Sequence, residues 1–354
     1  MKSYNHLYEK FISDENIKLA IKNACKHKLN RKKFRDLHDN PEKYIDWIRK
    51  QATDYRNDHH TPIQIYDGIQ RKKRVIIVPT FREQIIHHMT VNVLKPIIMK
   101  SMCEHSYGSI PNRGGVMGMK QIKKWIAHDP KNTRYCLKMD IKKYFDTVPH
   151  DVVVRRLTEQ IHDEKFLNVL LEIVNVNATG LPLGFYTSQW FANWYLTGLD
   201  HYIKEDLGAV YYMRYMDDMI VFGSNKRKLH RMRKEIERYL RDELGLELKG
   251  NWQVFPLKAR FLDFMGFRFY RYKITLRRSI LYKACRKAKK MSGIKPTIYA
   301  VRQILSYLGW FSQTDTYNVF TERIARYVNI QYMKRRMGKY DKRMAKLSGR
   351  LQAA

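Results

Sequence analysis

The chain has 354 residues, 44% of them hydrophobic, and its 68 lysines and arginines outnumber 34 acids to give a formal net charge of +34. This excess is spread along the chain and predicts a polyanionic partner, with nucleic acid favoured over a merely solubilised, ribosome-like surface. No apolar run approaches the roughly 20 residues of a membrane span, the first residues lack a signal peptide's apolar core, and four scattered cysteines indicate neither zinc nor disulfides, so we expect a cytoplasmic protein with no membrane partner.

The first part of the chain alternates basic helices with short strands. Residues 1–60 are expected to be helical, with Pro41 at the start of a helix. Residues 67–98 predict a turn, a basic strand that ends at Pro79, and an amphipathic helix. Residues 106–126 predict a loop punctuated by glycines and then a helix.

The middle of the chain repeats this pattern with more apolar segments. Residues 133–157 predict a strand, a turn and the start of a helix. Residues 181–203 predict a loop, a cap at Thr187 or Ser188, and one helix with its apolar residues on a single face.

The last part contains two predicted hairpins separated by a helix. Residues 210–223 read as two β-rich runs joined by a tight turn, and residues 225–244 as an amphipathic helix that stops at Gly245. Residues 261–276 predict a second hairpin. From about Arg277 onward the chain reads as basic helices with interspersed aromatic residues.

The first of these hairpins, "RYMDDMIVFG", places Asp217 and Asp218 side by side between apolar runs. Two adjacent carboxylates repel each other, and a divalent cation with a preference for hard oxygen ligands, such as Mg²⁺, relieves that repulsion. Aspartate is also common in solvated turns, so the pair alone leaves both interpretations open.

A third acid, Asp140, ends the β-rich run "YCLKMD". It is separated from Asp217 by 77 positions (217 − 140), so only a folded sheet can bring the two together. An acid at one strand end beside acids on a neighbouring hairpin is the layout of a two-metal site for nucleotidyl transfer.

The order of motifs resembles reverse transcriptases of the bacterial retroelement branch. "RYMDDMIVFG" is similar to that family's YxDD motif, "LKMDIKKYFDTV" to its first catalytic motif, and "LPLGFYTSQWFANWYL" to its template and nucleotide motif. "KRVIIVP" with "FREQIIHHM" resembles the fingers segment, "YGSIPNRGG" a loop of group II intron enzymes, and "FMGF" the primer grip. These segments cover roughly residues 65–270 in the family's order, which makes the signal specific.

The resemblance implies an α+β right-hand polymerase fold. Residues 1–60 would be an N-terminal basic helical extension, residues 61–275 the fingers and palm, and residues 276–354 a helical thumb that grips a duplex through its phosphates. The implied partners are template RNA, the RNA/cDNA duplex and dNTPs, in a bacterial or phage-encoded setting.

The resemblance also implies roles for individual residues. Asp140, Asp217 and Asp218 would be catalytic, and with the Ile141 carbonyl they would hold two Mg²⁺ ions, for which Mn²⁺ can substitute. Phe145 would exclude a 2′-hydroxyl and so select dNTPs, although core packing is its alternative role. The other nucleotide-binding candidates are Lys72, Arg74, Arg82, Gly184, Gln189 and Lys249. Lys249 is the candidate general acid, although the family usually carries this lysine a few residues later, where Asn251 and Trp252 stand here. The primer-grip candidates are Phe264, Met265, Gly266 and Phe267.

Two departures from the intron-type pattern point to a branch of the family. Leu183 precedes Gly184 where intron enzymes commonly carry glutamine, and Ser188-Gln189 follows. Both resemble the diversity-generating retroelements, whose enzymes make errors at template adenines and work with a small basic accessory protein. Leu183, with Arg74, is then a candidate fidelity residue, although drift without effect would also explain it. The alternatives are a retron, group II-like or antiviral-defence reverse transcriptase, and, least favoured, a non-catalytic RNA-binding protein.

Overall fold

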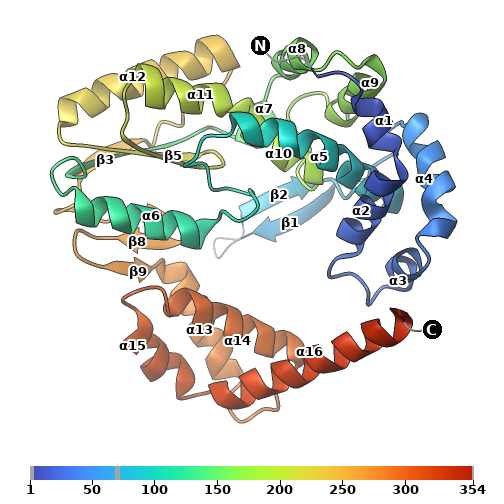
Figure 1. Cartoon of the computed structure of the whole chain (residues 1–354). Helices are drawn as coiled ribbons and strands as arrows, with labels where there is room; N and C mark the ends of the chain where they lie inside the picture. Colours follow the sequence, from blue (N-terminus) through green and yellow to red (C-terminus); the bar gives the residue numbers. More distant parts are fainter. Residues whose placement is uncertain (1–3, 68–71, 353–354) are drawn as a thin grey trace. The chain divides into compact units, whose positions relative to one another are not determined.

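The structure, a computed structural model, describes residues 4–67 and 72–352. Its mixture of helices and antiparallel strands confirms the expected α+β class (Figure 1). No helix in this part of the chain combines the length and apolarity needed to cross a membrane. In chain order the elements are α1 (Leu7–Ile12), α2 (Asp14–Cys25), α3 (Lys32–Asp39), α4 (Glu42–Thr53), β1 (Ile63–Asp67), β2 (Lys72–Ile76), α5 (Phe81–Ser101), α6 (Gly115–His128), β3 (Tyr135–Asp140), α7 (Tyr144–Thr147), α8 (His150–Gln160), α9 (Glu164–Val174), α10 (Tyr186–Tyr195), α11 (Thr197–His201), the π-helical turn η1 (Tyr202–Asp206), β4 (Tyr211–Tyr215), β5 (Asp218–Gly223), α12 (Lys226–Leu244), β6 (Gln253–Pro256), β7 (Leu262–Phe264), β8 (Phe267–Phe269), β9 (Ile274–Leu276), α13 (Arg278–Lys290), α14 (Ile298–Phe311), α15 (Tyr317–Phe320), the π-helical turn η2 (Thr321–Ala325) and α16 (Ile330–Gln352).

The chain divides into two compact units. The first comprises Met1–Ser109, Met139–Met219 and His230–Trp252, and the second Ile110–Lys138, Ile220–Leu229 and Gln253–Ala354. The three acids singled out in the sequence, Asp140, Asp217 and Asp218, all belong to the first unit.

In the first unit the N-terminal helices pack beside α5, with α2 and α4 in direct contact with it (Figure 1). The apolar residues of α2 that recur at helical spacing are buried: Ile17, Ala20, Ile21 and Ala24. α5 begins at a capping box, because Thr80 accepts the N–H of Glu83 and the Glu83 carboxylate accepts the N–H of Thr80. The helical character expected for residues 1–60 is confirmed for α1 to α4, and Pro41 directly precedes α4 as expected, but the helices end at Thr53 and residues 54–60 are not helical.

Residues 181–203 depart from the expected single capped helix. α10 begins at Tyr186, and its N-cap residue Phe185 makes no side-chain cap. Thr187 and Ser188 lie buried inside α10, so the prediction that one of them caps the helix is wrong. Packing of α10 against α5 decides where the helix begins and overrides the local capping preference.

Two strands have no counterpart in the sequence-based expectation. β1 pairs antiparallel with β2, and β6 pairs antiparallel with β3. The hairpin expected within residues 261–276 is confirmed by the pairing of β7 with β8, but β9 adds a third strand to it through the pair Phe267↔Leu276. All three strands are short, so their periodicity in the sequence is weak.

The four-stranded sheet, in the order β4-β5-β3-β6, contains the hairpin predicted for residues 210–223. Met213 of β4 and Ile220 of β5 are fully buried, which fixes the register of the hairpin. Met216 lies in the turn with φ +57°, in the left-handed region that a tight hairpin turn demands.

The second unit contains a comparable tight turn between β7 and β8. Met265 and Gly266 have φ values of +51° and +87°, as a two-residue turn with both central residues left-handed requires. Phe264 and Phe267 are fully buried, and the Phe267 ring stacks on Trp310 of α14 at 5.0 Å. A side chain at position 266 would press on that tryptophan at 3.0 Å, so glycine is required for packing as well as for the turn.

Candidate active site

Asp140 and Asp217 meet where β3 ends and where β4 turns into β5. Asp140 is the last residue of β3, Asp217 lies in the turn, and Asp218 is the first residue of β5. Ile141 donates its backbone N–H to the Asp217 carbonyl oxygen at 3.3 Å. The fold therefore brings together two acids that are far apart in the sequence.

The electrostatics of the two acids follow from this proximity. Burial raises the pKa of Asp217, and the negative charge of Asp140 raises it further, while its own backbone N–H, Arg74 and Lys249 act in the opposite direction. The Lys249 ammonium lies 2.8 Å from Asp140 Oδ2, and this hydrogen bond is the main cause that raises the pKa of Lys249. Asp218 lies close enough to contribute to the same shift. The site is a concentration of negative charge that attracts cations.

The donor set suits a divalent cation. Carboxylate oxygens are the hard ligands that Mg²⁺ prefers. The Asp140 carboxylate already binds one cation, the Lys249 ammonium. Within residues 4–67 and 72–352, no three His, Cys, Asp or Glu side chains converge closely enough to form a metal site by themselves. The larger ligand set, with Asp218 and the Ile141 carbonyl, stays a prediction.

A buried ion pair lies beneath the turn. Arg214 of β4 and Asp200 of α11 are both fully buried and bind through two parallel contacts, Nη2–Oδ2 at 2.6 Å and Nε–Oδ1 at 2.8 Å. The hydroxyls of Ser106 and Tyr212 also donate to the Asp200 carboxylate, at 2.9 and 2.6 Å. Burial opposes the charge of Arg214, but Asp200 outweighs it and raises the pKa of Arg214 above its ordinary value. Both charges are therefore compensated inside the core.

The same arginine also holds the backbone of the turn. Arg214 Nη1 donates to the Met216 carbonyl at 3.2 Å and to Asn193 Oδ1 at 3.1 Å, and Asn193 donates to the Gly108 carbonyl at 2.8 Å. Gly108 in turn leaves no space against Met216, since a Cβ on it would lie 2.6 Å from the Met216 nitrogen. The residue that precedes Asp217 is thus fixed from two sides.

This network was not predicted from the sequence. Its signal is the arginine in the otherwise apolar run "YYMRYM", because a charge in a buried strand requires a partner.

Phe145 lies on α7, close to the acids along the chain. Its carbonyl accepts the N–H of Leu181 at 2.6 Å, and a Cβ on Gly180, whose φ is +75°, would lie 2.4 Å from that oxygen. The ring is half-buried and packs edge-on to Tyr144 at 5.6 Å. Part of the ring therefore remains accessible to a ligand, unlike that of a core phenylalanine.

Gly184 lies against β2, and its expected contact with a nucleotide stays a prediction. The Leu183 carbonyl accepts the N–H of Ile77 at 2.7 Å. Gly184 has a φ of +117°, and a Cβ there would lie 2.1 Å from the Ile77 carbonyl oxygen. The close backbone approach expected from glycine is real, but its partner in the structure is the chain itself. The Leu183 side chain is half-exposed beside this contact.

The other predicted nucleotide contacts lie in different surroundings. Arg74 of β2 acts electrostatically on Asp217 and so belongs to the site. Lys72 begins β2, but its side chain lies outside the described residues. Gln189 is exposed on α10.

Arg82 binds residues other than Asp140, Asp217 and Asp218. Its guanidinium donates to Asp58 Oδ1 at 2.6 Å and to the Arg56 carbonyl at 2.5 Å, and it lies over the Tyr55 ring. A role in binding triphosphate would require this set of contacts to be exchanged. The primer-grip candidates Phe264, Met265, Gly266 and Phe267 form the tight turn of the second unit, and their role stays a prediction.

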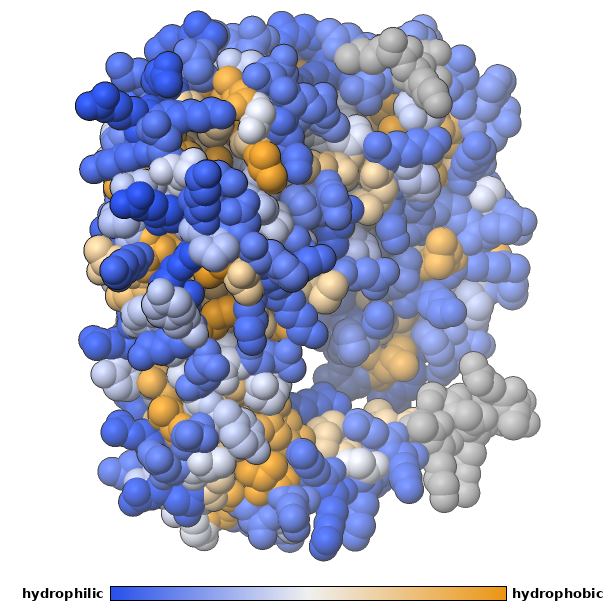
Figure 2. Space-filling model, turned by 60° about the vertical axis from the view of Figure 1, so that its left-hand side comes forward, coloured by the Kyte–Doolittle hydropathy of each residue, from blue (hydrophilic) through white to orange (hydrophobic). Residues whose placement is uncertain are grey.

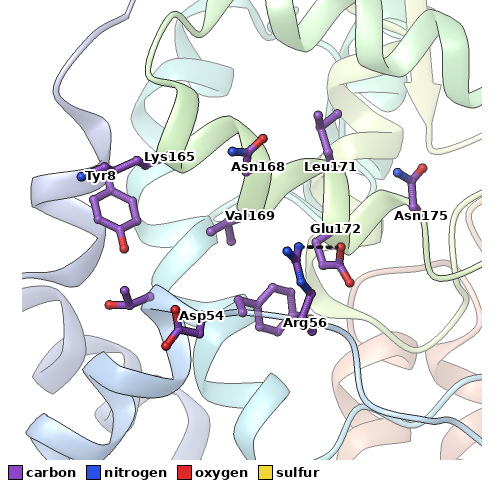
Figure 3. A pocket seen from close by; sticks show the side chains of 11 residues that line it. Tyr8, Asp54, Arg56, Lys165, Asn168, Val169, Leu171, Glu172 and Asn175 are labelled. Atoms are coloured by element: carbon purple, nitrogen blue, oxygen red, sulfur yellow. Dashed lines mark hydrogen bonds and ion pairs between the residues drawn. The ribbon is translucent and has the colours of Figure 1, made fainter.

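A cavity of roughly 660 Å³ lies between the N-terminal helices and α9 (Figure 3). Its lining includes charges of both signs, among them the ion pair of Arg56 and Glu172 at 3.5 Å. None of the three acids lines it, so chemistry at the acids does not take place in this cavity.

A family model described as reverse transcriptase (RNA-dependent DNA polymerase) matches residues 58–269, well over half of the chain. The chain belongs to the reverse transcriptase family. The matched range contains Asp140, Asp217 and Lys249, and membership confirms the expected right-hand polymerase fold of a reverse transcriptase.

Relatives of this reverse transcriptase come from several kinds of genetic element. Protein YkfC of Escherichia coli strain K12 is 22% identical over 243 residues, which cover 56% of this chain and 64% of that protein. The retron Ec73 reverse transcriptase of Escherichia coli is 25% identical over 145 residues, 37% of this chain and 46% of that protein. The group II intron-encoded protein LtrA of Lactococcus lactis subsp. cremoris is 24% identical over 145 residues, 38% of this chain and 24% of that protein.

Solved structures of telomerase also align with this reverse transcriptase. The apo telomerase from Candida tropicalis, truncated from its C-terminal domain, aligns with a TM-score of 0.48 at 14% identity over 66% of this chain and 59% of that one. The chain spans less than two thirds of each of these relatives.

Proposed function

We propose that the protein is an RNA-directed DNA polymerase that extends a primer on an RNA template. The observation that carries this proposal is the meeting of Asp140 and Asp217 inside the range that matches the family. The test is dNTP incorporation on poly(rA)/oligo(dT) with Mg²⁺. Absence of incorporation by the wild type would favour the non-catalytic RNA-binding alternative.

Each polar group of the site has a role in this proposal. Asp140 and Asp217, with Asp218 and the Ile141 carbonyl, would hold two Mg²⁺ ions, or Mn²⁺ in their place. The metal would lower the pKa of the primer hydroxyl and neutralise charge on the phosphates. Lys249, protonated and held beside Asp140, donates a proton to the leaving pyrophosphate. Arg74, near Asp217, offers positive charge to the triphosphate.

We expect Phe145→Val to weaken discrimination against ribonucleotides by roughly tenfold to a hundredfold, because a single steric exclusion is worth about that much. The partly exposed ring would occupy the space that a 2′-hydroxyl needs, and valine would vacate it. The measurement is a competition between dNTP and rNTP on one template. Unchanged discrimination, with dNTP incorporation intact, would assign Phe145 to packing alone.

Within this activity we favour the diversity-generating branch. Leu183 and Gln189 support it, since both match that branch's pattern in the sequence. Its partners would be template RNA, the RNA/cDNA duplex and a small basic accessory protein, in the cytoplasm. The division into an N-terminal extension (1–60), fingers and palm (61–275) and thumb (276–354) belongs to the same proposal. The retron and group II intron relatives keep those alternatives open.

Errors concentrated opposite template adenines are the expected result for this branch. A glutamine before Gly184 could hydrogen-bond near the new base pair and penalise poor geometry, whereas Leu183 can only pack. Sequencing of cDNA copied from a defined RNA should show these errors in the wild type and fewer of them in Leu183→Gln. Adenine errors as rare as those at other bases in the wild type would reject the branch and leave reverse transcription intact.

A further inference from the structure

α12 carries a line of positive charge along its solvent-facing side. Arg231, Lys234, Arg238 and Arg241 follow one another at spacings of three and four residues, so they project from one face of the helix. All four are exposed. At 1.5 Å per residue, the line is about 15 Å long.

The opposite side of the same helix is apolar and packed. Leu229, Met232, Ile236, Leu240 and Leu244 are all buried. The basic line therefore points directly away from the body of the protein, into solvent. Figure 2 brings forward the side on which α12 lies in Figure 1, and that surface is mostly hydrophilic.

Two of the four charges have an acidic partner, and both pairs are weak. Arg238 pairs with Glu235 and Arg241 with Asp242, but these are exposed neighbours on the same helix, and such pairs contribute little.

We propose that this face of α12 is a binding surface for the phosphate backbone of double-stranded RNA, outside the duplex that is being extended. A straight helix with cations in a row can follow phosphates without reading bases. Surfaces that hold single strands combine cations with aromatic residues on which bases stack, and none of the exposed residues of α12 is aromatic. The inference rests on the proposed function, since folded segments of the template RNA would be the natural occupant.

The test compares two variants with the same loss of charge. In Arg231→Gln/Lys234→Gln/Arg238→Gln/Arg241→Gln the line is removed while helix propensity is kept. In the control, Lys22→Gln/Lys32→Gln/Lys43→Gln/Lys50→Gln, four exposed lysines scattered over α2, α3 and α4 are changed. Binding to a blunt RNA duplex of about 20 base pairs is measured over a range of salt concentrations, together with primer extension on a short poly(rA)/oligo(dT) substrate.

We expect the α12 variant to lose at least tenfold in duplex affinity at low salt. The slope of log affinity against log salt should become shallower by between about three and four, as expected for the loss of four phosphate contacts. Extension of the short substrate should stay near wild type, and the control should change little in either assay. Equal effects of both variants on duplex binding would overturn the proposal. A loss of short-substrate extension by the α12 variant as large as its loss of duplex binding would also overturn it, because α12 would then contact the copied duplex. Polyglutamate at matched charge should displace the RNA less effectively than unlabelled duplex does. Equal displacement would overturn the proposal in favour of an acidic protein partner. Failure of the wild type to extend any primer would reject the proposed function, but the binding comparison would still be decisive for α12.

Discussion

Replacement of Asp217 by asparagine is expected to reduce primer extension by about a thousandfold or more. The variant removes one of the two carboxylates that meet at the site and so weakens the stabilisation of charge in the transition state by several kcal/mol. Single-turnover extension of a labelled primer measures this loss directly. Asp206→Asn makes the same chemical change at an exposed position after α11 and should leave the rate unchanged.

The same variant should be more stable than the wild type at neutral pH. The folded-state pKa of Asp217 is raised, so folding favours the protonated carboxyl. The stability that the protonated form contributes is fully present below the unfolded-state pKa and is lost as pH rises through the folded-state pKa. At pH 7 the buried carboxylate is therefore unfavourable, and the neutral asparagine avoids that cost. We expect Tm to rise by a few degrees at pH 7 and to change little below about pH 4. Loss of activity together with a lower Tm would indicate misfolding and contradict the assignment.

Breaking the ion pair between Arg214 and Asp200 should produce the largest loss of stability. In Asp200→Ala the arginine would remain buried without a counter-charge, which typically costs about 3–5 kcal/mol in the free energy of unfolding. Denaturant unfolding followed by circular dichroism measures this cost. Asp242→Ala, which removes the exposed partner of Arg241, is the matched control and should have no measurable effect.

A double variant separates the structural role of this pair from its role in positioning the turn. Arg214→Met/Asp200→Leu removes both charges, and such replacements are often close to neutral for stability. Primer extension should nevertheless stay low, mainly through kcat, because the Met216 carbonyl loses its donor Arg214 Nη1. Recovery of both stability and kcat to wild-type values would show that the pair does not position the turn.

Much of the site could be predicted because its residues carry chemistry in recognisable local patterns. Asp140 ends a β-rich run and Asp217 lies between two others, so both positions followed from the sequence once the strands were expected to pair. A hairpin within residues 261–276 was expected as well, and its turn lies at Met265 and Gly266. In each case a few neighbouring residues determine the local structure.

What the sequence missed depends on contacts between distant segments. The start of α10 is set by packing against α5, and no side-chain cap marks it in the sequence. The engagement of Arg82 by Asp58 depends on the chain that leads from α4 into β1, which periodicity does not place. The support of Met216 by Arg214, Asn193 and Gly108 joins three separate segments and becomes visible only in the folded chain.

The contact between Gly184 and Ile77 has a consequence for how this enzyme can evolve. No side chain fits at position 184, where even a methyl group would lie 2.1 Å from a carbonyl oxygen, so this position tolerates almost no variation. The neighbouring Leu183 binds Ile77 through its backbone carbonyl, and its side chain is half-exposed. Selection can therefore exchange the side chain at 183 without loss of the hydrogen bond to Ile77. If Leu183 sets fidelity as proposed, one substitution there could change the error rate while Gly184 and the surrounding architecture stay the same.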